Sequence, residues 1–201
     1  MATVVAMHVI AGRFKGTPLA SAPSGTRPTT DRTKEAVFSR LEAWNMLEGS
    51  RVLDLFAGTG ALGFEALSRG AASLVAVDSS SAATTAIQRV ADRMRIRGDG
   101  SAHVDVRTVK MSVYRYLRSA ASECFDVVFA DPPYDHPTEG CEEILGVLSD
   151  QRMLPPEGIV VMERSARSRD PREDPRWSLV DRRTYGETEV LYYEITSSLE
   201  R

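Results

Sequence analysis

Segments predicted as strands and helices alternate along most of this 201-residue chain, and this alternation restricts its possible folds more than any other feature. Short apolar runs that predict strands are separated by longer segments whose apolar residues recur at helical spacing. A strand–helix–strand repeat almost always folds as a parallel sheet with helices on its faces. The predicted strands are 51–56, 73–77, 102–109, 125–130 and 158–162, and the helices between them are 60–69, 81–97, 111–119 and 138–148.

The C-terminal part of the chain departs from this repeat. Residues 178–184 and 188–195 predict two strands joined by Tyr185-Gly186-Glu187, an antiparallel hairpin. The run 125–130 is continuously apolar, which is typical of a central strand buried on both faces. We therefore predict an α/β fold with a mostly parallel seven-stranded sheet and a C-terminal antiparallel hairpin. Ligands in such sheets bind at the carboxyl ends of the strands.

The N-terminal part predicts a small β-hairpin extension over residues 7–19, with Gly12 and Gly16 as turn residues. Residues 21–29 are rich in Ser, Pro, Gly and Thr and predict a linker, and a helix is expected from Thr30. We therefore divide the chain into an arm and linker over 1–29 and a main domain over 30–201.

Composition excludes several classes of protein. No apolar run reaches the ~20 residues of a membrane helix, and residues 1–11 lack the pattern of a secretory signal. The two cysteines, Cys124 and Cys141, do not have the spacing of a zinc site. We expect a cytoplasmic protein with reduced thiols, no metal and no membrane partner. Because the formal net charge is −3, any nucleic-acid surface must come from a local basic patch.

The segment from Asp54 to Gly63 is the first chemical signal. Gly58, Gly60 and Gly63 satisfy G-x-G-x-x-G, a pattern that also occurs in nicotinamide and flavin proteins. Asp54 precedes the glycines at a predicted strand end, where a carboxylate would repel a pyrophosphate but favour the cationic amino-acid end of S-adenosylmethionine. Asp78 ends the next strand and could bind ribose hydroxyls in either class. The alternatives are a strand-end carboxylate with structural hydrogen bonds and a plain glycine turn.

Asp131-Pro132-Pro133-Tyr134 follows the most apolar strand and is the second chemical signal. An aromatic amine is a poor nucleophile because its lone pair is delocalised, so a site that methylates it must accept hydrogen bonds from its N–H groups. The Asp131 carboxylate and the Pro132 carbonyl could do so, on a loop stiffened by two prolines. Tyr134 could stack on a base. The alternative is a proline-rich strand exit with a surface tyrosine.

Basic residues gather near the N-terminus. The first 34 residues carry five basic side chains, Lys34 among them, and one acidic side chain. Arg13 and Lys15 flank Phe14, a pattern suited to phosphate and base contacts. The alternative is a solvated hairpin whose charges keep an exposed edge soluble. We interpret the arginines of the 81–97 helix as a solvated face, and we do not assign His136 as a base.

These motifs together resemble the Asn/Asp-Pro-Pro-Tyr/Phe class of amino-methyltransferases. The stretch Met7-His-Val-Ile-Ala-Gly-Arg-Phe-Lys-Gly and the segment Arg27-Pro-Thr-Thr-Asp-Arg narrow the resemblance to the bacterial RsmD family, over about residues 7–194. The resemblance implies a Rossmann-like class I methyltransferase fold. It also implies transfer of the methyl group of S-adenosylmethionine to N2 of one guanine in 16S rRNA, with S-adenosylhomocysteine as product. We expect this RNA to be bound within a small-subunit particle, and naked RNA is the alternative that the sequence leaves open.

The resemblance also implies roles for individual residues. The catalytic candidates are Asp131, Pro132 and Tyr134; the cofactor candidates are Asp54, Phe56, Gly58, Gly60, Asp78 and Met111; the substrate candidates along the RNA approach are Arg13, Lys15, Arg27, Thr29 and Arg32. Relatives often carry a polar Asn or Asp after the third strand, where this chain has Val109-Lys110-Met111. We therefore expect backbone groups and Met111 to hold the adenine.

Three other functions stay open from the sequence. The same chemistry could act on adenine N6 in DNA, although no long target-recognition insertion is evident. The chain could also be a non-catalytic RNA-binding or assembly factor that keeps the fold. A nucleotide-dependent oxidoreductase is the third alternative.

Overall fold

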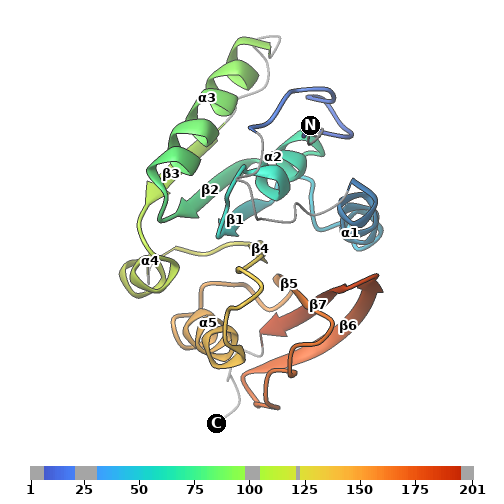
Figure 1. Ribbon diagram of the computed structural model, residues 1–201, viewed down its shortest axis with the longest axis vertical. Coiled ribbons are helices and arrows are strands. Elements are labelled where there is room, and N and C mark those ends of the chain that lie inside the picture. The colour runs from blue at the N-terminus through green and yellow to red at the C-terminus, as the bar shows by residue number, and fades with distance from the viewer. Residues whose placement is uncertain (1–6, 21–30, 98–104, 121–122, 196–201) are drawn as a thin grey trace, which may run out of the picture.

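The computed structural model describes residues 7–20, 31–97, 105–120 and 123–195 (Figure 1). The described chain folds as a mixed α/β structure with a C-terminal hairpin. Its elements in chain order are α1 (Asp31–Ala43), β1 (Arg51–Leu55), α2 (Ala61–Ser68), β2 (Ser73–Asp78), α3 (Ser81–Arg97), β3 (Asp105–Lys110), α4 (Val113–Ser119), β4 (Val127–Ala130), α5 (Thr138–Asp150), β5 (Ile159–Ser165), β6 (Trp177–Tyr185) and β7 (Thr188–Ile195).

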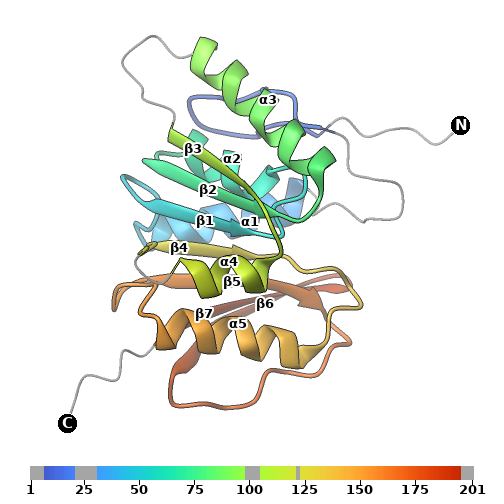
Figure 2. The same ribbon diagram turned by 90° about the vertical axis from the view of Figure 1, so that its left-hand side faces the viewer.

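The strands form one seven-stranded sheet in the order β3-β2-β1-β4-β5-β7-β6, and Figure 2 shows them stacked in this order. The five strands from β3 to β5 are parallel, while β7 is antiparallel to both of its neighbours, β5 and β6. After β3 the chain returns to the other side of β1 to form β4. The strand order therefore reverses between β1 and β4, which is where open α/β sheets bind ligands.

Helices cover both faces of the sheet, because successive strand residues point to opposite sides. On one face, α1, α2 and α3 pack over a core that includes Val52, Phe129 and Tyr192. On the other face, α4 and α5 pack over a second core that includes Leu53 and Val128. Every residue of β4 is buried, as its apolar run predicts. The predicted fold class is thus confirmed.

The N-terminal hairpin is present over residues 7–19, with a bridge between His8 and Pro18 and a backbone hydrogen bond from Val9 to Thr17 of 3.0 Å. Its apolar side chains, among them Val9 and Phe14, belong to the same buried core as α1 to α3. In Figure 1 its blue trace runs beside α2. The hairpin is therefore packed on the main domain.

Glu65 of α2 anchors this hairpin. Its fully buried carboxylate accepts hydrogen bonds from the backbone N–H groups of Ile10 (2.8 Å) and Ala11 (3.0 Å). Lys34, 1% exposed, lies 3.7 Å from the same carboxylate and donates to the His8 carbonyl at 2.9 Å. Arg69 donates to the other carboxylate oxygen at 2.9 Å. A buried carboxylate is tolerated when it is paired and hydrogen-bonded in this way.

Most predicted elements agree with the structure to within a few residues. The third strand is shorter where it is described, beginning at Asp105, and the predicted part before it lies outside the described residues. The same holds for the linker 21–29 and for Thr30, the residue from which a helix was expected. In the described part of the chain, no helix combines the length and the apolar character needed to cross a bilayer.

Candidate active site

The carboxyl ends of β1 and β4 bring the two sequence motifs together. In the parallel pairing of these strands, Asp54 lies opposite Phe129 and Leu55 lies opposite Ala130. The next residues, Phe56 and Asp131, therefore leave the sheet as neighbours. The glycine segment continues from one strand and the Asp-Pro-Pro-Tyr segment from the other, so both motifs begin at the point where the strand order reverses.

The glycine segment makes a tight turn between β1 and α2. Phe56, Gly58 and Gly60 all have positive φ, at 60°, 53° and 77°. A Cβ at Gly60 would lie 2.7 Å from the Phe64 ring, whereas one at Gly58 would meet nothing closer than the Phe56 carbonyl at 3.8 Å. Gly60 is therefore required by packing as well as by φ. Gly58 leaves open backbone that a ligand can approach.

Asp54 lies under this turn with only 2% of its side chain exposed. Its Oδ2 accepts a hydrogen bond of 3.0 Å from the N–H of Gly63 in the first turn of α2. Burial raises the pKa of this carboxyl to about 7, with the Gly63 hydrogen bond lowering it and the charge of Asp78 raising it further. The alternative interpretation of Asp54, a strand-end carboxylate with structural hydrogen bonds, is thus correct for one of its two oxygens, which binds the N–H of Gly63. A cation bound near this carboxyl would lower its pKa and favour the ionised form.

Asp78 is bonded to the glycine segment. Its Oδ2 accepts from the N–H of Gly58 at 2.8 Å, and its Oδ1 accepts from the N–H of Ser80 at 2.7 Å. Each carboxylate oxygen has two lone pairs, so both can still accept a hydrogen bond from a ribose hydroxyl. Asp78 was expected to bind ribose hydroxyls of the cofactor. In the structure it also holds the glycine turn in place, through the N–H of Gly58. Met111, the adenine candidate, is half-buried, and its N–H donates to the Asp78 carbonyl at 3.1 Å.

The Asp-Pro-Pro-Tyr segment forms a turn above β4. Asp131 is half-buried, Pro132 is buried, and the carbonyl of Pro133 accepts a hydrogen bond of 2.8 Å from the N–H of His136. The turn after Asp131 is thus closed by a hydrogen bond to the Pro133 carbonyl. We name residues 131–137 the substrate loop.

Tyr134 is half-exposed, and its hydroxyl lies 3.2 Å from Oγ1 of Thr188, the first residue of β7. The side chain is therefore held at its hydroxyl end and is half-exposed to solvent. Thr188 was not predicted as a site residue. Thr188 belongs to no sequence motif. The antiparallel pairing of β7 with β5 places it opposite Ser165, at the carboxyl end of β5.

His136 and Tyr114 are further residues at this site that the sequence did not indicate. The His136 ring lies 5.3 Å from the Phe56 ring, edge to face, and its Nε2 lies 2.8 Å from the Tyr114 hydroxyl. Burial lowers the pKa of His136, and the charge of Arg164 lowers it further. The only signal in the sequence was its place two residues after Tyr134.

Phe14 of the arm and Lys34 of α1 differ from the prediction of a basic N-terminal surface. Phe14 is buried at 4% exposure, so it cannot stack on a base; Arg13 instead lies over its ring, 4.9 Å from the centroid. Lys34 is buried against Glu65 and adds no charge to the surface. Arg13, Lys15 and Arg32 are exposed as expected. The other two substrate candidates, Arg27 and Thr29, lie outside the described residues.

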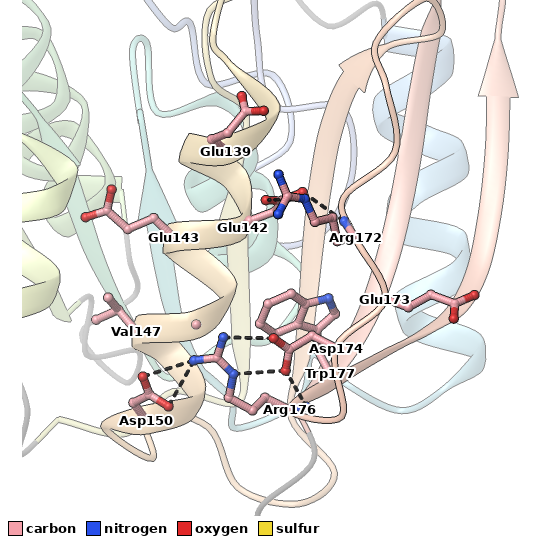
Figure 3. A pocket seen from close by; sticks show the side chains of 11 residues that line it. Glu139, Glu142, Glu143, Val147, Asp150, Arg172, Glu173, Asp174, Arg176 and Trp177 are labelled. Atoms are coloured by element: carbon pink, nitrogen blue, oxygen red, sulfur yellow. Dashed lines mark hydrogen bonds and ion pairs between the residues drawn. The ribbon is translucent and has the colours of Figure 1, made fainter.

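A cavity of about 470 Å³ lies away from these residues, between α5 and the segment before β6 (Figure 3). Acidic side chains line it, but arginines compensate them: Arg176 contacts Asp150 and Asp174, and Arg172 contacts Glu142. We assign no function to it. Among the described residues, no cluster of His, Cys, Asp or Glu could hold a metal ion.

The fold and the paired loops define a Rossmann-like methyltransferase. The structure is similar to "Putative methyltransferase yhhF from Escherichia coli", with a TM-score of 0.77, 28% identity, and coverage of 96% of this chain and 100% of that one. It is also similar to a protein titled "putative methylase HI0767 from Haemophilus influenzae", with a TM-score of 0.71, 25% identity, and coverage of 95% and 99%.

The chain belongs to the family described as "Conserved hypothetical protein 95", the RsmD family, which matches residues 7–194. Relatives are similar over almost the whole chain. "Putative rRNA methyltransferase YlbH" of Bacillus subtilis is 35% identical, covering 94% of this chain and 98% of that protein. "Ribosomal RNA small subunit methyltransferase D" of Escherichia coli K12 is 30% identical, covering 94% and 89%.

Proposed function

We propose that this protein transfers the methyl group of S-adenosylmethionine to the exocyclic N2 amine of a guanine in 16S rRNA, within a small-subunit particle in the cytoplasm. The observation that carries the proposal is the register of β1 and β4, which places Asp131 beside the glycine segment at the switch point. The name of the Bacillus subtilis relative refers to rRNA, and that of the Escherichia coli relative refers to the small subunit, which supports the choice of substrate.

The glycine segment fits S-adenosylmethionine in three respects. Gly58 presents open backbone, Asp54 offers a buried carboxyl that a cation would ionise, and Asp78 lies at the end of β2 with oxygens that can accept from ribose. Phe56 and Met111 supply apolar surface at the ends of β1 and β3. When bound, S-adenosylmethionine would supply a sulfonium methyl group that is already activated. Methyl transfer from it requires no metal and no covalent nucleophile.

The substrate loop would orient the amine. The Asp131 carboxylate accepts one N–H of the exocyclic amine and the Pro132 carbonyl accepts the other, which directs the nitrogen lone pair out of the ring conjugation. Tyr134 stacks on the base, a contact worth about 1–3 kcal/mol. The rate gain comes from alignment of the amine with the methyl group. The proton leaves late, to Asp131 or to water.

The exposed cations of the arm would hold the RNA. Arg13 and Lys15 lie on a hairpin fixed to α2 through Glu65, so their positions relative to the main domain are defined. Phosphate contacts from such residues position the RNA without reading its sequence, and the pocket selects the base. Arg27, Thr29 and Arg32 extend the same proposed approach.

The test is methyl labelling followed by nucleoside identification. Small-subunit particles that lack the family's modification are incubated with the protein and labelled S-adenosylmethionine, and the digested RNA is separated by chromatography and mass spectrometry. We expect the label in N2-methylguanosine. Label in N6-methyladenosine, or equal labelling of duplex DNA, would show that the substrate assignment is wrong.

A further inference from the structure

His136 connects the two loops of the candidate site through its ring. One contact is with Phe56 of the glycine segment, at 5.3 Å between ring centroids and 67° between planes. The other is with Tyr114 on α4, whose hydroxyl lies 2.8 Å from Nε2 and whose ring is nearly parallel, at 17°. The ring therefore lies between the expected cofactor side of the site and the helix that follows Met111.

The backbone of His136 is held equally firmly. Its N–H donates to the Pro133 carbonyl at 2.8 Å, which closes the turn after Asp131. Its carbonyl accepts a hydrogen bond of 3.4 Å from Arg164, a buried arginine of β5 that also donates to Thr138 at 3.2 Å. The backbone of His136 thus holds both the turn after Asp131 and a contact with β5.

Gly140 of α5 gives the His136–Tyr114 pair its space. A Cβ at this position would lie 2.4 Å from the Tyr114 hydroxyl and 2.5 Å from His136 Nε2. Its φ is not in the left-handed region, so the backbone conformation does not demand glycine here. The absence of a side chain is required by the contact between the two rings.

We propose that His136 is a positioning residue that holds the substrate loop in register with the glycine segment through Phe56. The inference rests on the proposed function, since the register matters for methyl transfer, in which alignment supplies most of the rate gain. His136 does not take the proton of the amine in this account; its Nε2 is bonded to Tyr114. A ligand that packs against Phe56 would thereby also hold residues 131–137, through the contact between the Phe56 and His136 rings.

The first test compares His136→Ala, His136→Gln, Tyr114→Phe and Gly140→Ala in single-turnover methyl transfer to RNA particles. We expect His136→Ala to lower the rate about 10- to 100-fold, with the dissociation constant of S-adenosylhomocysteine and the KM for particles little changed. His136→Gln should recover part of the rate, because its amide can still bond to Tyr114. Gly140→Ala should mimic His136→Ala by pushing the rings apart.

Thermal unfolding and cofactor titration separate positioning from a structural role. A structural role would lower stability, cofactor binding and rate together, and glutamine would not recover the rate selectively; that result would overturn the inference. The combined His136→Ala and Tyr114→Phe variant should lose no more rate than His136→Ala alone, because both changes break the same link. Additive losses would also contradict it.

The second test needs no turnover. Hydrogen exchange of residues 131–137 is measured with and without S-adenosylhomocysteine in the wild type and in His136→Ala. We expect the ligand to protect the loop in the wild type and to protect it less in the variant. Equal protection would overturn the inference while leaving the proposed function intact. Methylation of a different nucleoside would refute the guanine assignment alone, and a wild type that binds no cofactor would refute both.

Discussion

The hydroxyl of Tyr134 lies 3.2 Å from Oγ1 of Thr188, so the aromatic residue of the substrate loop is tied to the first residue of β7. The ring and the hydroxyl can therefore be tested separately. Tyr134→Ala should raise the KM for RNA or lower the rate by the equivalent of about 1–3 kcal/mol. Tyr134→Phe and Thr188→Val should each cost well under tenfold, because they keep the ring. Kinetics on RNA particles check this, and a Tyr134→Phe loss as large as that of Tyr134→Ala would argue against stacking.

Gly12 lets the arm approach α2, and Gly16 is its matched control. Both have positive φ, of 77° and 79°, but a Cβ at Gly12 would lie 1.9 Å from the Ser68 carbonyl, while one at Gly16 meets nothing within 4 Å. Gly16→Ala should cost about 1 kcal/mol of unfolding free energy from backbone strain. Gly12→Ala should cost distinctly more and should weaken RNA binding, with cofactor affinity kept. Denaturant unfolding and particle binding measure the difference; equal behaviour of the two variants would contradict the docked arm.

The exposed cations of the arm should appear in the salt dependence of RNA binding. Arg13→Ala combined with Lys15→Ala should weaken particle binding and reduce the slope of log K against log salt by roughly 1–2. The control is Arg89→Ala with Arg93→Ala, which removes two exposed cations of α3 interpreted as a solvated face. Equal slopes for the two double variants would mean that the arm does not contact phosphates.

Asp54 predicts a pH dependence of cofactor binding. Burial raises its pKa to about 7, so the carboxyl is mostly protonated at pH 6 and mostly ionised at pH 8. A cationic ligand selects the ionised form, so affinity for S-adenosylmethionine should rise with pH through this range, by at most about tenfold per pH unit. Asp54→Asn keeps an acceptor for the Gly63 N–H and should flatten the profile. Calorimetric titration at several pH values measures it.

The same pKa predicts the sign of a stability change. Between about pH 4 and pH 7 the unfolded Asp54 has lost its proton while the folded one keeps it, so the unfolded state is favoured as pH rises. The wild type should therefore lose stability relative to Asp54→Asn across this window, by up to a few kcal/mol. If the difference in unfolding free energy between the wild type and Asp54→Asn stayed constant with pH, the raised pKa of Asp54 would be contradicted.

The fold could be predicted because its signals are local. The apolar runs mark strands, the helical spacing marks helices, and the repeat fixes the parallel sheet, which in turn places Asp54 and Asp131 at the same edge. What could not be predicted depends on pairs that are distant in the chain. In the sequence, Lys34 has the features of a solvated helix residue. In the structure it is buried, because Glu65 of another helix compensates its charge. Phe14 is buried by its docking on α2, and His136 gains its role from Tyr114 on α4.

The most direct test of the central claim is methyl transfer by Asp131→Ala, a variant that lacks the oxygens that would accept a hydrogen bond from the amine. Undermodified small-subunit particles and labelled S-adenosylmethionine are incubated with the wild type and the variant, and nucleosides are identified after digestion. The account predicts N2-methylguanosine from the wild type, a loss of at least about 100-fold in the variant, and unchanged affinity for S-adenosylhomocysteine. Transfer by the variant at the wild-type rate, with normal cofactor binding, would contradict it.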